Sequence, residues 1–272
     1  MHDKMIFYFI LYSFLGWCLE SIYKSILQRK PVNSGFLYGP FCPMYGIGAV
    51  LMIALGGISD NIVVIFIMAF LLFSIWEYIV AVILEKLFKT KYWDYSHLKF
   101  NIKGRVCLKN SIYWGILGVL LIFVIQPWIE NLTNLIPTNI LVYINIILSI
   151  AIGVDAVITV VKIMVIDKKI AEIFELGETI KEKLVELKKS ETIEKAYKEN
   201  IQKLVEDLKA KQTMLKFKIY KRIIRLKKSF PEMHSENITE FMKQKISLEE
   251  LKEKIKKNKA IKTNKKHKEK RG

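Results

Sequence analysis

From Met5 to Ile166 the chain alternates between long apolar runs and short polar connections. A membrane-spanning helix needs about 20 consecutive, mostly apolar residues. The runs that reach or approach this length are Met5–Leu27, Phe41–Leu55, Ile62–Leu84, Ile112–Ile129 and Ile140–Ile166. The pattern therefore predicts an all-α fold, a polytopic transmembrane bundle of about five helices.

Two of these runs can be interpreted in more than one way. Phe41–Leu55 is short and follows glycines and prolines, which interrupt helices, so it fits either a full span or a re-entrant segment. Met5–Leu27 could belong to a cleaved signal peptide. However, no small-residue cleavage site follows it, and Glu20 and Lys24 lie where such a peptide has small residues. We therefore expect a first transmembrane helix.

After the last apolar run the pattern becomes polar, rich in Lys and Glu, with apolar residues recurring at helical spacing. One long coiled-coil helix fits this spacing as well as two helices broken near Lys188–Thr192. Ser190 could cap the second of two such helices, and Ser247 could begin a further short helix. The predicted domains are a transmembrane domain (1–167), a cytosolic helical or coiled-coil region (168–230), short helical segments (231–255) and a basic disordered tail (256–272).

Charge adds a direction to this pattern. The chain carries a net charge of +17, most of it after the apolar runs. Among the connections, Lys24–Gly39 and Glu85–Asn110 are basic, whereas Gly56–Asn61 and Glu130–Asn139 contain no Lys or Arg. Because Lys and Arg are retained on the cytoplasmic side, five spans would place the amino terminus outside and the carboxy terminus in the cytoplasm.

Four ionisable residues fall within the apolar runs: Glu20, Glu77, Asp155 and Lys162. Each costs about 2.5–3.5 kcal/mol in a membrane helix on insertion scales, so each requires a partner or a function. Helical spacing places Glu20 and Glu77 on inward faces at similar depth, where they could be packing contacts, line a transport path or act as catalytic carboxylates. Asp155 and Lys162 lie on one face of the last run, and we expect them to form an ion pair.

The remaining chemistry is sparse. The chain has no phosphate-binding loop of the G-x-x-x-x-G-K-[ST] type, and its histidines are too scattered for a metal site. No nucleophile or cofactor motif is recognisable, so the sequence predicts no enzymatic activity, no catalytic residue, no metal and no cofactor. The mixture of aromatic and basic residues in Glu85–Leu108 favours contact with anionic lipid headgroups. The basic tail favours lipid or a partner helix over nucleic acid, because it lacks an aromatic stacking platform.

Several segments occur in an order that resembles a known family. They are Tyr12–Glu20, Asn33–Gly46, Glu77–Tyr78, Leu84–Phe88, Trp93–Ser96 and Asn101–Leu108. Over about Met5–Asp167 the chain is similar to the bacterial membrane family labelled "putative ABC-transporter permease" (CmpB-like, type IV). The residues that the matched motifs carry over are Gly16, Trp17, Glu20, Gly35, Tyr38, Gly39, Pro40, Glu77, Trp93, Asp94, Tyr95, Asn101, Gly104 and Arg105.

The resemblance implies a multi-pass protein of the bacterial cell membrane that acts as the permease subunit of a transport system, with a separate ATPase as partner. Glu20, Glu77 and Asp155 would then line the transport path. The alternative is a membrane-anchored scaffold or sensor that acts through its basic cytosolic helices. In either case these helices could also join copies of the chain into a homo-oligomer.

Overall fold

The computed structural model describes residues 2–189, 195–243 and 249–256. The described chain is almost entirely helical and divides into two compact units. One contains Met1–Ile163 together with Leu226–His234, and the other contains Met164–Arg225 and Ser235–Gly272. By its contacts, segment 226–234 therefore belongs with the first unit. Residues 190–194, Ser247 and the predicted disordered tail from 257 onward lie outside the described residues.

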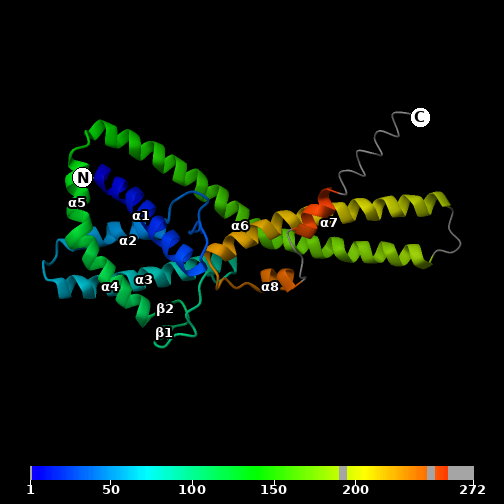
Figure 1. Ribbon diagram of the computed structural model, residues 1–272, viewed down its shortest axis with the longest axis horizontal. Helices are drawn as coiled ribbons and strands as arrows, with labels where there is room; N and C mark the ends of the chain where they lie inside the picture. Colours follow the sequence, from blue (N-terminus) through cyan, green and yellow to red (C-terminus); the bar gives the residue numbers. More distant parts are fainter. Residues whose placement is uncertain (1, 190–194, 244–248, 257–272) are drawn as a thin grey trace. The chain divides into compact units, whose positions relative to one another are not determined.

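The first unit confirms the predicted all-α polytopic bundle (Figure 1). Four of its described helices are long and apolar enough to cross a membrane. They are α1 (His2–Gln28), α3 (Ile62–Phe88), the continuous helix made of α4 (Leu108–Leu120), η1 (Leu121–Ile125) and α5 (Gln126–Asn134), and the first part of α6 (Thr138–Lys189). Many large apolar side chains along them remain exposed, as lipid-facing positions require. The chain is thus a multi-pass membrane protein.

The third spanning helix passes through a proline. Pro127 has no N–H to donate and its ring crowds the preceding turn, so an ordinary α-helix would kink there. The five residues of η1, immediately before α5, form a π-helical turn instead. Such a turn re-pairs the backbone locally. The helix consequently continues to Asn134, beyond the predicted end of this span at Ile129.

The second predicted span is a much shorter helix, α2 (Pro43–Gly56), which begins with a proline in its first turn. Its 14 residues cover only about 21 Å at 1.5 Å per residue, less than the roughly 30 Å of a bilayer core. The Cys42 N–H donates to the Ser13 carbonyl at 2.9 Å, so α2 begins beside the middle of α1.

From that point α2 runs antiparallel to both α1 and α3, between which it lies (Figure 1). Met44, in its first turn, accepts a hydrogen bond from Trp76 of α3, whereas Met52, near its end, packs with Tyr8 and Ile65, close to the starts of those helices. The non-helical connection between α1 and α2 therefore extends along one half of the length of α1, and α2 extends along the other half. Together they make one crossing, which explains how a 14-residue helix can connect two long spans.

The core of this unit is formed by aliphatic, aromatic and small apolar side chains where α1, α2, α3, η1 and α5 meet. Its buried members are Tyr8, Tyr12, Ala49, Met52, Ile65, Ala69, Phe73, Leu121 and Ile129. Between α3 and α4 the chain forms a small hairpin of β1 (Asn101–Ile102) and β2 (Val106–Cys107). The hairpin turns through Lys103 and Gly104, both with positive φ, as tight hairpins require.

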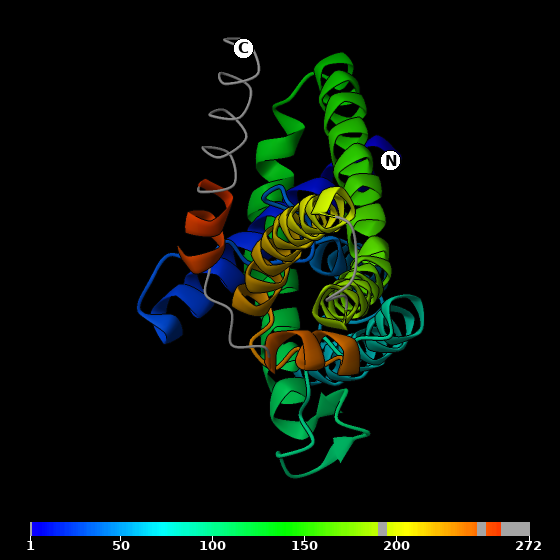
Figure 2. The same cartoon turned by 90° about the vertical axis from the view of Figure 1, so that its right-hand side faces the viewer.

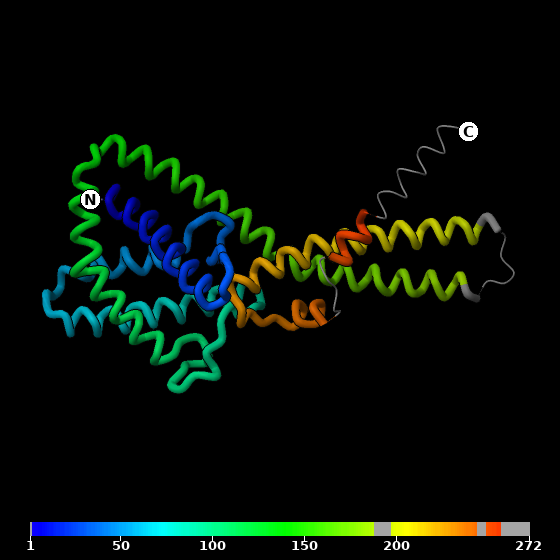
Figure 3. The backbone as a smooth tube through the Cα atoms, in the orientation of Figure 1, coloured from blue at the N-terminus to red at the C-terminus, as the bar shows by residue number. Residues whose placement is uncertain are grey.

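The second unit is built on an antiparallel helix pair (Figures 2 and 3). The later part of α6 packs against α7 (Lys195–Ser229) through Ile180, Ile201 and Val205. At the other end of the pair, Gln212 donates to the Ile173 carbonyl at 3.0 Å. Of the two arrangements that the sequence allowed, the structure has two helices rather than one. The short helix α8 (Glu236–Lys243) and helical residues 249–256 complete this unit.

Candidate functional site

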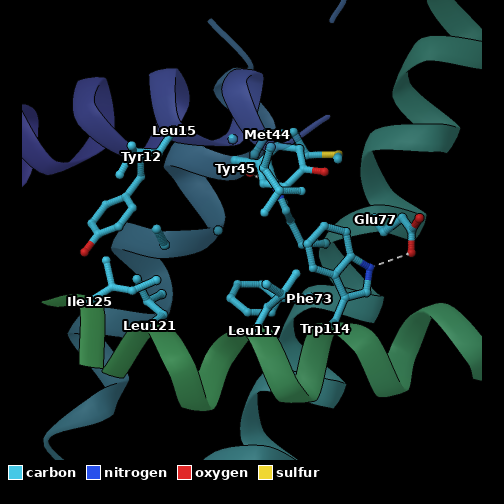
Figure 4. A pocket seen from close by; sticks show the side chains of 15 residues that line it. Tyr12, Leu15, Met44, Tyr45, Phe73, Glu77, Trp114, Leu117, Leu121 and Ile125 are labelled. Carbon is cyan, nitrogen blue, oxygen red and sulfur yellow. Dashed lines mark hydrogen bonds between the residues drawn. The ribbon is translucent and has the colours of Figure 1, made fainter. Parts of the chain in front are cut away.

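A cavity of about 130 Å³ lies inside the first unit, bordered by α1, α2, α3 and the α4–η1 helix (Figure 4). Tyr12 and Ile125 stand at one end, and Glu77 and Trp114 stand at the other. Among the described residues that line the cavity, Glu77 is the one charged side chain. The cavity therefore combines an apolar, aromatic wall with a single carboxylate at one end.

The Glu77 carboxylate is held by neutral donors. The indole N–H of Trp114 donates to Oε2 at 3.0 Å, and the hydroxyl of Tyr95 donates to Oε1 at 3.2 Å. Glu77 is 4% exposed, and among the described residues no lysine, arginine or histidine forms an ion pair with it. A buried carboxylate without a cationic partner is costly unless it takes up a proton or meets a cation. That requirement makes Glu77 the strongest functional candidate in the bundle.

Tyr95 reaches Glu77 from the connection between α3 and α4. Its backbone N–H donates to the Gly104 carbonyl at 2.7 Å, which fixes the connection against the β-hairpin. Asp94 accepts hydrogen bonds from Ser96, which lower the pKa of its carboxyl group. Burial and the nearby charge of Glu77 raise the pKa of Tyr95 well above its usual range. The phenol therefore stays protonated and remains a hydrogen-bond donor to Glu77.

Other family-motif residues of this connection form hydrogen bonds and an ion pair that fix its conformation. The Trp93 indole donates to the Arg105 carbonyl at 3.0 Å, and the Asn101 side chain donates to the Leu98 carbonyl at 2.7 Å. The Arg105 guanidinium forms an ion pair of 2.6 Å with Glu85 of α3 and donates to the Tyr78 hydroxyl at 2.9 Å. These residues attach the connection to α3 and so keep Tyr95 in place.

Glu20 has a different environment from Glu77. Its Oε1 forms an ion pair of 2.8 Å with Lys24 one turn later on α1, and its Oε2 accepts a hydrogen bond from the Cys42 thiol at 3.4 Å. Tyr45, in the first turn of α2, interacts electrostatically with both Glu20 and Glu77. The two predicted carboxylates are thus brought to the same region of the bundle, one paired and the other unpaired.

Asp155 and Lys162 contact the connection between α1 and α2 instead of each other. Asp155 Oδ2 accepts the Gly39 N–H at 2.7 Å, and its Oδ1 accepts the Tyr38 N–H at 3.2 Å. The Lys162 ammonium lies 4.3 Å from the centre of the Tyr38 ring. The ion pair expected along the helix is therefore replaced by separate contacts to one loop.

Glycines and Pro40 give this loop its shape. Gly35 has a φ of +102°, a left-handed conformation that favours glycine. Pro40 is the central residue of a tight turn in which the Phe41 N–H donates to the Gly39 carbonyl at 2.9 Å. A side chain at Gly39 would also approach Asp155 closely, its Cβ lying 3.1 Å from Oδ2.

Segment 226–234 packs on two connections of the first unit, the one between α1 and α2 and the one between α3 and α4. The Ser229 hydroxyl donates to the Asn33 carbonyl at 3.0 Å, and the Ser229 carbonyl accepts a hydrogen bond from Lys24. Lys91 and His234 exchange two backbone hydrogen bonds, of 3.0 and 2.9 Å. Phe230 lies against Tyr92, with ring centres 5.0 Å apart. The ion-paired Lys24 of α1 is thus also a partner of this carboxy-terminal segment.

The structure gathers some of the predicted residues and separates others. Glu20 and Glu77 lie near α2, whereas Asp155 and Lys162 lie at the loop that precedes it. The sequence does not predict the aromatic cavity wall, because its side chains come from four elements. The packing of Phe230 has a usable signal in the sequence, an aromatic residue beside a proline at the end of a basic helix.

Residues 7–160 match a family described as "Putative ABC-transporter type IV". No curated protein and no solved structure matches the chain. In the described part of the chain no group of three or more His, Cys, Asp or Glu side chains could hold a metal ion.

Proposed function

The chain belongs to the family described as "Putative ABC-transporter type IV", and we propose that it is the permease subunit of a transport system whose ATPase is a separate polypeptide. The observation that carries this proposal is the buried Glu77, without a cationic partner among the described residues, at one end of a cavity in the membrane bundle. A membrane-embedded carboxylate facing a cavity is typical of substrate and ion pathways. The half-length helix α2 also supports it, because interrupted helices border the binding sites of many transporters.

Under this proposal, the substrate passes through this chain and ATP is hydrolysed by a different polypeptide. ATP hydrolysis requires a phosphate-binding loop, and the sequence contains no G-x-x-x-x-G-K-[ST] segment. We therefore infer a transport role without an enzymatic reaction of the chain itself. Within it, Glu77 would contact the substrate, and Tyr95 and Trp114 would position the carboxylate.

Purification of the tagged chain from its native membranes tests this function. We expect a P-loop ATPase to co-purify and to hydrolyse ATP in proteoliposomes. Glu77→Gln should change that rate by about tenfold, the effect of losing one interaction of about 1.4 kcal/mol. Glu130→Gln, which alters an exposed carboxylate of α5, is the matched control and should leave the rate unchanged. A complex without an ATPase, or a Glu77→Gln complex as active as the native one, would contradict the proposal.

The proposed orientation places the amino terminus outside and the carboxy terminus in the cytoplasm of a bacterial cell. Two exposed positions test it, Asp60 between α2 and α3 and Lys103 at the hairpin turn. In a background with Cys18→Ala, we expect Asp60→Cys to react with an impermeant maleimide added outside intact cells. Lys103→Cys should react only after the cells are opened, and the reverse pattern would overturn the orientation.

The hairpin turn also supports the proposed contact with lipid headgroups. Phe100 and Ile102 are 78% and 61% exposed and are flanked by Lys99 and Lys103. Exposed apolar side chains between basic ones fit an anionic membrane surface. We propose the same kind of contact for the basic carboxy-terminal helices, in preference to nucleic acid, and these helices could also join two copies of the chain.

A membrane-anchored scaffold or sensor is the second candidate function. It is favoured by the contacts of segment 226–234 with Lys24 and Lys91, because this segment lies in the sequence directly between the main part of α7 and α8. Under this alternative the basic helices would bind the partner. Full activity after deletion of residues 170–272 would contradict it.

A further inference from the structure

Five aromatic rings converge on the cavity beside Glu77. They belong to Tyr12 of α1, Tyr45 of α2, Phe73 and Trp76 of α3, and Trp114 of α4. Tyr45 and Trp114 lie with ring centres 5.6 Å apart, and the same distance separates Phe73 from Trp114. Figure 4 shows the side chains of Tyr45, Phe73 and Trp114 meeting from three different helices. Aromatic faces attract cations through their quadrupole, and such cages are typical of sites for alkylated ammonium groups.

The charge of the site favours the same ligand. Glu77 is the charged residue among those that line the cavity, and its described hydrogen bonds come from three neutral side chains, Trp114, Tyr95 and Asn110. A positive ligand in the cavity would supply the missing counter-charge. An anion would instead face an uncompensated carboxylate, at a cost that rises in a low-dielectric interior.

The size and lining of the cavity limit the ligand further. Its volume of about 130 Å³ is close to that of an apolar protein cavity of about 150 Å³ that admits benzene. A group of a few heavy atoms therefore fits. Mg²⁺ and Ca²⁺ require several oxygen ligands, whereas this wall is mostly carbon and offers a single carboxylate.

We propose that this cavity binds the ammonium group of a small alkylated organic cation, with Glu77 as its counter-ion and the aromatic rings as its cage. The inference rests on the proposed transport function, for which it names the substrate class. Tyr45 and Trp114 contact the cation, while Trp114 also orients the carboxylate through its indole N–H. Because α2 carries Tyr45, the half-length helix forms one wall of the binding site.

Binding to the purified full-length chain tests the inference without any ATPase. The probes are choline and its uncharged isostere 3,3-dimethyl-1-butanol, added to protein in a maltoside detergent, which has no ammonium group. Binding is followed by calorimetry and by tryptophan fluorescence, to which Trp76 and Trp114 of the cavity wall contribute. We expect choline to bind at least about tenfold more tightly than the alcohol, as a desolvated cation–π and carboxylate contact predicts.

A substitution then tests whether the negative charge of Glu77 is required for choline binding. Glu77→Gln should weaken choline binding by about tenfold or more and leave the alcohol unaffected, whereas Glu130→Gln should change neither. Equal affinity for the two probes, or binding of neither, overturns the inference. The probe comparison uses native protein, so it decides the matter even if Glu77→Gln fails to fold.

The two proposals can fail separately. An active complex with an ATPase that does not bind choline would retain the transport function and remove the organic-cation site. Selective choline binding by a chain that has no ATPase partner would retain the site and remove the proposed transport system.

Discussion

Gly46→Ala is expected to prevent α2 from packing against α1, because the added methyl group has no space. A Cβ atom at Gly46 would lie 2.2 Å from Ser13 Oγ and 2.4 Å from the Phe9 carbonyl oxygen. The second atom belongs to the backbone of α1 and cannot rotate away. Overpacking of this kind commonly costs about 1–3 kcal/mol, and more where a backbone must shift.

The change should lower the midpoint of thermal unfolding by roughly 10 °C, on the basis of about 2–4 °C per kcal/mol for a domain of this size. Unfolding in detergent and the monodisperse fraction in size-exclusion chromatography measure it. Gly57→Ala is the matched control. It adds the same methyl group at the end of the same helix, where the Cβ position has no neighbour within 4 Å.

A double variant separates the two obstacles. When Ser13→Ala is combined with Gly46→Ala, the Ser13 hydroxyl is removed but the Phe9 carbonyl stays in place. The second substitution should therefore not restore stability. Full recovery in the double variant would mean that the side chain alone limits the approach of the helices. A stable Gly46→Ala protein would contradict the close packing of α1 and α2 itself.

The sequence predicts the long helices well because membrane insertion is read from local composition. Each of Ile62–Phe88 and Leu108–Asn134 contains one of the predicted apolar runs, and a helix satisfies its own backbone hydrogen bonds within that run. The inward placement of Glu77 also follows locally, since a carboxylate on a lipid-facing side would be far more costly.

Contacts between distant segments are not encoded in this way. Seven residues along a helix separate Asp155 from Lys162, and this spacing suggested an ion pair. The structure places the N–H groups of Gly39 and Tyr38 against Asp155 instead. Those donors become available because Gly35 and Pro40 turn a loop back into the bundle, an arrangement that depends on tertiary packing rather than on helical periodicity.

The cavity was missed for the same reason. Its aromatic residues are scattered from Tyr12 to Trp114 and are unremarkable within apolar runs, where large side chains usually pack the core. The one related signal in the sequence is the short second run, beside Pro40 and Pro43, which fits a re-entrant segment as well as a full span. The pattern of apolar residues does not indicate how α1, α2, α3 and α4 pack together around Tyr45.

Phe230→Ala is expected to release segment 226–234 from the first unit. Phe230 is 9% exposed, lies in edge-to-face contact with Tyr92, and has the Lys24 ammonium 4.9 Å from its ring centre. Truncating a buried phenylalanine to alanine costs about 3–5 kcal/mol. Leu226 and Met233 of the same segment are also buried, each 3% exposed, so the loss at Phe230 should appear as local opening of the segment rather than as unfolding of the first unit.

Hydrogen exchange measures this opening directly. The amides of Lys91 and His234 bond to each other's carbonyls, and in Phe230→Ala they should exchange at least about 100-fold faster, as a local loss of about 3 kcal/mol requires. Lys228→Ala is the control, since that side chain is exposed and its carbonyl still accepts a hydrogen bond from Gln28. Unchanged protection of both amides in Phe230→Ala would show that the backbone bonds hold the segment without the ring.

The same variant distinguishes the two candidate functions. Lys24 contacts the carbonyl of Ser229, the ring of Phe230 and the carboxylate of Glu20, so the substitution and the release of the segment leave this ammonium with Glu20. In a permease whose site is Glu77, choline binding should persist in Phe230→Ala, because the ring lies outside the cavity wall. In a scaffold or sensor, loss of the attachment should abolish the activity while the cavity stays intact. An active Phe230→Ala protein with exposed Lys91 and His234 amides would therefore favour the permease.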